Sequence, residues 1–152
     1  MTHWKSGGLI KAIVLGGIVA GTIDIGAACL IYVRSVPYIL RGIAGGLLGE
    51  RSFAGGTRTA AIGFILQEGM GVVIAAFYAW LCQVLRLSKH RWPQWGVVYG
   101  AGIFVVMNYV VVPLSAWRAI PSFSTWTFAG NVAAMFLFGL IVAFFWNRET
   151  RT

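Results

Sequence analysis

The sequence is short of charge, and short of acidic charge above all. Only 11% of its 152 residues are charged, and 4 Asp and Glu stand against 12 Lys and Arg. Hydrophobic residues make up 59% of the chain, whereas a typical soluble domain has roughly 45–50% apolar and about 25% charged residues. A small soluble domain cannot hide so much apolar surface, because it buries only about two-thirds of the surface of its unfolded chain. The composition therefore excludes a soluble enzyme and a disordered tail, and it indicates an integral membrane protein.

Cysteine and histidine are also scarce. The two cysteines, Cys29 and Cys82, fall in different hydrophobic segments, which argues against a disulfide scaffold. Neither stands in a metal-ligand spacing with His3 or His90, and the sequence has no Ser-His-Asp pattern. We therefore expect no metal site, no cofactor and no enzymatic activity.

Long hydrophobic runs are abundant. A bilayer core of about 30 Å needs roughly 20 apolar residues in a helix, and a helix satisfies its own backbone polar groups in lipid. The sequence therefore predicts an all-α membrane protein, a single bundle of four transmembrane helices over residues 1–152. The first run is too long for a signal peptide, so we expect it to be retained as a span. The predicted spans are residues 9–33, 59–85, 95–112 and 127–146.

The connection between the first two spans carries a short amphipathic segment, residues 36–49. Ile39, Ile43 and Leu47 recur there every four residues, and glycines form a second stripe. The segment is too short to cross a bilayer, so we expect an interfacial or re-entrant helix. Its glycines would allow another backbone to approach closely.

Basic residues flank the predicted spans, and no basic run reaches five residues. We interpret them as topology determinants that meet anionic lipid headgroups, and we expect no nucleic-acid partner. More of them lie on the side of both termini, which predicts that both termini face the cytoplasm. That side has seven (Lys5, Lys11, Arg86, Lys89, Arg91, Arg148, Arg151), and the other side has five (Arg34, Arg41, Arg51, Arg58, Arg118).

Two acidic residues lie inside predicted spans, where a charge costs roughly 2.5–3.5 kcal/mol on insertion scales. Asp24 lies ten residues before Arg34, and Glu68 lies ten residues after Arg58. In antiparallel neighbouring helices both would lie about 15 Å below the same surface. Small residues share a helical stripe with each acid, and such stripes mark packed faces. We therefore expect both carboxyls to point into the bundle.

A second set of polar residues is expected nearer the same surface. Asn108 lies five residues before Pro113, which marks the end of its segment, and Asn131 lies five residues after Trp126, which marks the start of its segment. With Gln67, which adds a donor beside Glu68, they would line a polar pocket that opens toward the first connection. Arg41 and Arg51 are the candidate charge partners above this pocket.

Two interpretations of these polar residues remain open. In the functional one, the pocket binds protons or a cation, because two close carboxyls in a low dielectric share one proton. In the structural one, the acids are protonated or paired with arginine, and the asparagines tie the helices together.

Several motifs resemble those of a known family. They are Ala20-Gly21-Thr22-Ile23-Asp24, Arg41 to Gly49, Phe53-Ala54-Gly55-Gly56, Tyr99-Gly100 and, most specifically, Met107 to Ser115 (MNYVVVPLS). Over nearly its whole length the chain resembles an uncharacterised group of small four-span proteobacterial inner-membrane proteins and, more distantly, YagU-like proteins. The resemblance implies a helical bundle in the bacterial inner membrane and no established activity. The family often has histidines in the second and fourth spans, where this chain has Gln67 and Ala134, which argues against a shared histidine chemistry.

For function, the sequence favours an accessory or interaction subunit, held in a larger membrane complex or a homo-oligomer. One alternative is a small proton- or cation-linked transporter or channel that uses Asp24 and Glu68. The other is a lipid-binding protein that uses the glycine-rich helix and its arginines.

Overall fold

The computed structural model describes residues 6–118 and 121–150, and it confirms the predicted fold, an all-helical chain with four potential membrane spans. The four are long and apolar enough to cross a bilayer. Throughout the described ranges every regular element is helical. The spanning helices are α1 (Ser6–Tyr32), α3 (Gly56–Val84), α4 (Trp92–Val106) with its continuation, and α6 (Thr125–Glu149).

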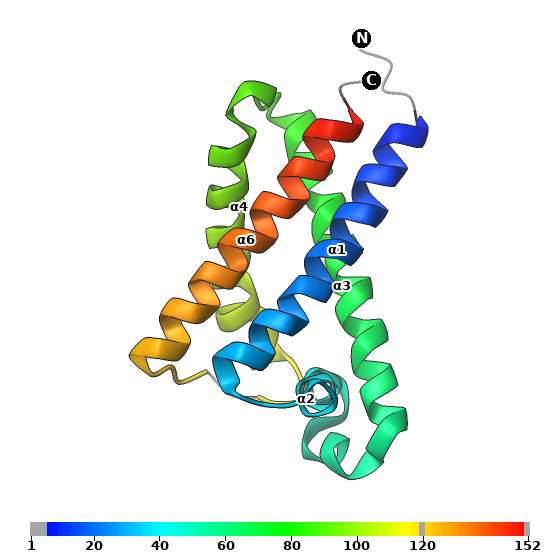
Figure 1. Ribbon diagram of the computed structural model, residues 1–152, viewed down its shortest axis with the longest axis vertical. Coiled ribbons are helices and arrows are strands. Elements are labelled where there is room, and N and C mark those ends of the chain that lie inside the picture. The colour runs from blue at the N-terminus through cyan, green and yellow to red at the C-terminus, as the bar shows by residue number, and fades with distance from the viewer. Residues whose placement is uncertain (1–5, 119–120, 151–152) are drawn as a thin grey trace.

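The spanning helices run lengthwise, and α2 (Val36–Leu48) lies across the end opposite the described ends of the chain (Figure 1). Helix α6 packs against both α4 and α1, and α1 packs against α3. Between α3 and α4 the contact includes a side chain, since the Tyr99 hydroxyl donates to the Ile74 carbonyl at 2.6 Å. These contacts place the interior of the bundle among all four spans.

Small residues allow the closest helix contacts. The carbonyl of Gly17 in α1 lies against Gly71 in α3, and that of Gly96 in α4 lies against Gly139 in α6. A side chain at either of these sites would meet backbone atoms of the neighbouring helix. In lipid, where no hydrophobic effect draws helices together, such close packing is a main source of their association.

Helix α2 is the short helix expected between the first two spans. A proline in its first turn supplies a backbone angle suited to a helix start, and Gly49, with φ of +64°, ends it. The helix rests on α3 through the Leu40 carbonyl, which lies against Gly63. Leu47, by contrast, is 64% exposed. A short 3-10 helix, η1 (Gly49–Gly55), then leads into α3.

The loop that precedes α6 packs onto the glycine stripe of α2. The indole Nε1 of Trp117 donates to the Gly42 carbonyl at 3.2 Å, and the amide of Ala116 donates to the Gly46 carbonyl at 2.8 Å. The Trp117 ring also occupies the space that a Cβ would need at Gly45. The close approach expected at these glycines therefore comes from the loop that precedes α6, which lies at the same end of the bundle as α2.

Helix α4 continues through a π-helical turn, η3 (Met107–Val111), into the short α5 (Val112–Leu114). Pro113 explains the change, because it has no amide hydrogen and its ring crowds the carbonyl four residues earlier. The Val112 amide donates instead to the Met107 carbonyl, five residues back. The wider turn therefore begins at Met107.

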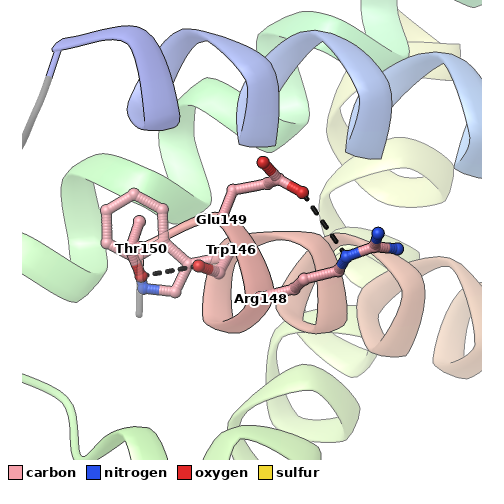
Figure 2. Close-up of polar contacts among 4 residues, drawn as sticks. All are labelled: Trp146, Arg148, Glu149 and Thr150. Atoms are coloured by element: carbon pink, nitrogen blue, oxygen red, sulfur yellow. Dashed lines mark hydrogen bonds and ion pairs between the residues drawn. The ribbon is translucent and has the colours of Figure 1, made fainter. Parts of the chain in front are cut away.

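At the opposite end of the bundle, the end of α6 contacts the connection between α3 and α4. The Thr150 hydroxyl donates to the Trp146 carbonyl at 2.6 Å, and the Arg148 guanidinium lies 3.6 Å from the Glu149 carboxylate; both contacts are drawn in Figure 2. The Lys89 ammonium, from the connection between α3 and α4, donates to the Thr150 carbonyl at 2.7 Å. The end of α6 and the α3–α4 connection therefore lie at the same end of the molecule.

Candidate functional site

A small cavity of about 30 Å³ lies in the interior of the bundle. This volume holds one or two water molecules. Each of the four spans contributes to its wall, and the lining is apolar apart from one carboxyl and one amide. The lining residues are Asp24, Gln67, Met70, Gly71, Ile74, Ile103, Met107, Met135 and Phe138.

The two polar lining residues are bonded to each other across the α1–α3 contact. The amide Nε2 of Gln67 donates to Oδ2 of Asp24 at 2.8 Å. Gln67 is only 7% exposed, and Asp24 is half-buried. Their bond shows that these positions of α1 and α3 lie at the same depth.

Glu68 takes a different direction. Its Oε1 accepts a hydrogen bond from the Thr22 hydroxyl at 3.1 Å. Its Oε2 is buried without a hydrogen-bond partner among the described residues, and it lies beside Gly21, 3.3 Å from where a Cβ would stand. Glu68 therefore packs in the α1–α3 contact and does not line the cavity that Asp24 lines.

Neither intramembrane carboxyl has a cationic partner in the described part of the chain. No lysine, arginine or histidine in residues 6–118 and 121–150 forms an ion pair with Asp24 or Glu68. Each accepts a hydrogen bond from a neutral side chain instead. An ionised carboxylate so placed in lipid is costly unless a proton or a cation compensates its charge.

The two asparagines lie away from the cavity. Each donates to the carbonyl four residues earlier in its own helix: Asn108 to Phe104 at 2.9 Å, and Asn131 to Thr127 at 2.6 Å. Asn131 also donates to the Tyr32 hydroxyl at 3.0 Å. Asn131 thus links α6 to the end of α1, and Asn108 satisfies a carbonyl just before the π turn.

The two candidate arginines lie at the α2 end. Arg41 donates through Nε to the Pro37 carbonyl at 3.1 Å and through Nη1 to the Phe53 carbonyl at 3.3 Å. It therefore fastens α2 to η1. Arg51 is exposed. The structure thus brings Asp24 and Gln67 together in the cavity, places Glu68 beside them, and leaves the asparagines and arginines elsewhere.

No methionine was among the site residues that the sequence predicted. The chain has four methionines, and three of them, Met70, Met107 and Met135, line the cavity. They come from three different helical segments, so no periodicity within one helix could show that they meet. Among the described residues no group of three or more His, Cys, Asp and Glu could hold a metal ion, and thioethers lie outside that set.

Comparison of the chain with models of protein families, with curated proteins and with solved structures found no match. We therefore infer function from the geometry of the cavity and of the two carboxyls.

Proposed function

We propose that the protein binds a proton or a small monovalent cation inside the membrane and carries it across, with Asp24 as the binding carboxyl. One observation carries this proposal. Asp24 lines a small cavity among four apolar spans, and its hydrogen-bond partner there is the neutral amide of Gln67.

The free-energy cost of a charge inside the membrane supports this proposal. A carboxylate at this depth is unfavourable by several kcal/mol unless it is neutralised, and one amide donor does not neutralise it. A proton on Asp24, or a cation beside it, removes that cost. The cavity therefore has two states that differ in charge, which is the property a carrier of protons or cations requires.

Glu68 supports the proposal as a second carboxyl at the same depth. It packs against α1 at Gly21 and Thr22, within three residues of Asp24 in the sequence. Carboxyls in series within a membrane are typical of proton relays. The buried Oε2 of Glu68 has no described partner, so a proton on that oxygen would lower the cost of burying the carboxyl.

The accessory and lipid-binding roles stay predictions, because no described contact identifies a partner or a lipid. Extraction in mild detergent tests the first of them, since an accessory subunit should be recovered with a defined partner. A clean monomer would count against it.

Flux into proteoliposomes tests the transport proposal. An entrapped pH-sensitive dye reports proton entry under an imposed membrane potential. Sodium and potassium are tested in the same way as the alternative transported cations. We expect flux with the unchanged chain, a loss of at least about tenfold with Asp24→Asn, and a smaller loss with Glu68→Gln. Glu50→Gln is the matched control, because Glu50 is exposed in η1 outside the spans.

Two results would contradict the proposal. One is the absence of proton or cation flux from correctly inserted protein. The other is flux that Asp24→Asn and Glu68→Gln leave equal to that of the Glu50→Gln control.

A further inference from the structure

We propose that the cavity is a binding site for a soft monovalent metal ion, Cu(I) or Ag(I). The thioethers of Met70, Met107 and Met135 would be the ligands, and Asp24 would balance the charge. The inference deepens the proposed function and rests on it for the role of Asp24, because it names the class of cation that this site takes.

Methionine side chains from separate helical segments meet at the cavity. Three of the four in the chain line one cavity of about 30 Å³, one from α3, one from η3 and one from α6. A methionine side chain is unbranched and flexible, so its sulfur can turn toward an ion with little backbone movement. Thioether sulfur is a soft ligand that selects Cu(I) among biological metals.

The described lining of the cavity offers few other metal ligands. Calcium takes six to eight oxygen ligands, and magnesium requires six in octahedral geometry. Among the described residues only Asp24 and Gln67 bring side-chain oxygens to the cavity. Zinc is usually held by thiolate or imidazole, and no cysteine or histidine is among the described residues that line the cavity. The lining therefore suits a soft ion that needs few ligands.

A metal ion in the cavity would need a compensating negative charge. Three thioethers are neutral, so a Cu(I) ion bound by them alone would keep its full positive charge inside the membrane. The Asp24 carboxylate supplies the compensating negative charge within the same cavity. Gln67 fixes that carboxylate through the 2.8 Å bond to Oδ2, as outer partners commonly orient the groups around a metal.

The π turn contributes the placement of one ligand. Met107 is the first residue of η3, and its carbonyl accepts the wide-turn hydrogen bond from Val112. Such turns within helices occur frequently at functional sites. Here the turn follows from Pro113, and it lies where the helix contributes to the cavity wall.

Silver titration tests the site. Purified protein in detergent is titrated with Ag(I) by calorimetry in a Cys29→Ala/Cys82→Ala background, because free thiols would also bind silver and both cysteines are free. We expect about one silver ion per chain and sulfur neighbours in the X-ray absorption spectrum of the bound metal. Each single Met→Leu variant should weaken binding at least about tenfold, a scale typical even of lost outer-shell partners.

Leucine keeps the volume of methionine nearly unchanged, so the variants test the sulfur rather than the packing. Ile13→Leu is the matched control, because Ile13 packs against the same apolar core but is not among the residues that line the cavity, and this variant should bind as the background protein does. A variant with all three Met→Leu changes should bind no silver, and if that variant does not fold, the three single variants decide the question. Silver binding that survives all three changes, or no silver binding by the background protein, would overturn the inference.

The two proposals can fail separately. Proton flux that depends on Asp24, without methionine-dependent silver binding, would overturn the metal site and leave the transport proposal in place. Silver binding that depends on the methionines, without flux of any cation, would support the metal site and contradict transport.

Discussion

Two glycine residues fix the distance between α1 and α3 beside the cavity. A Cβ on Gly71 would lie 2.5 Å from the carbonyl oxygen of Gly17, and one on Gly17 would lie 2.6 Å from the Cα of Val72. These neighbours are backbone atoms, which cannot turn aside as the tip of a side chain can. Gln67 lies one helical turn before Gly71, so the hydrogen bond to Asp24 depends on this close contact.

Gly71→Ala should therefore destabilise the bundle. Overpacking of a tight contact costs about 1–3 kcal/mol, and the helices would have to separate to admit the methyl group. Unfolding of detergent-solubilised protein by increasing SDS measures the loss. Gly69→Ala is the matched control on the same helix, because a Cβ there meets nothing within 4 Å, and alanine favours the helix over glycine. Equal stability of the two variants would contradict a backbone contact at Gly71.

The adjacent residues Gln67 and Glu68 show where sequence reasoning succeeds and where it stops. Counting from the basic flanks predicted that Asp24 and this part of the second span lie at one depth, and the Gln67–Asp24 bond joins them there. The rotation of α3 could not be counted in this way. Successive residues point about 100° apart around a helix. An error in the assumed rotation of α3 about its own axis therefore exchanges the residue that faces the cavity with its neighbour. Tertiary packing decides that angle.

At the scale of elements, α2 is held between a span and a loop. On one side the backbone of α2 packs against Gly63 of α3, and on another side Trp117 covers the glycines of α2. The glycine stripe was visible in the sequence and indicated a close approach. The residue that covers these glycines could not be predicted, because Trp117 lies 75 residues after Gly42 and its loop has no periodic pattern. The π turn was hidden for a similar reason, since Pro113 could equally have ended the helix.

Trp117→Phe should loosen α2 without affecting the spans. Phenylalanine keeps an aromatic ring against Gly45 but cannot donate to the Gly42 carbonyl. A hydrogen bond of this kind contributes about 1 kcal/mol, so the amides of α2 should exchange with deuterium roughly five times faster. Mass spectrometry of the exchanged protein measures the rate. Trp126→Phe is the matched control, because Trp126 is 70% exposed at the start of α6. Faster exchange in both variants would show a general loss of stability instead.

At the scale of the whole molecule, the four spans separate two polar ends. One end carries α2, η1 and the loop that precedes α6, and the other carries the α3–α4 connection and the end of α6 (Figure 1). The number and approximate extent of the spans follow from hydropathy, because lipid requires about 20 apolar residues for each crossing. The orientation depends on a smaller difference, seven basic residues against five. It therefore needs a direct measurement.

Cysteine labelling measures the orientation. In the Cys29→Ala/Cys82→Ala background, Glu50→Cys places a thiol in η1 and Ser88→Cys places one between α3 and α4, both at exposed positions. A membrane-impermeant maleimide should label Glu50→Cys in intact cells, and it should label Ser88→Cys in inside-out vesicles, because the positive-inside rule predicts that the more basic end faces the cytoplasm. The reverse pattern would contradict the orientation but keep the four spans. Labelling of both thiols from one side would contradict the fold itself, since a single span, α3, separates the two positions.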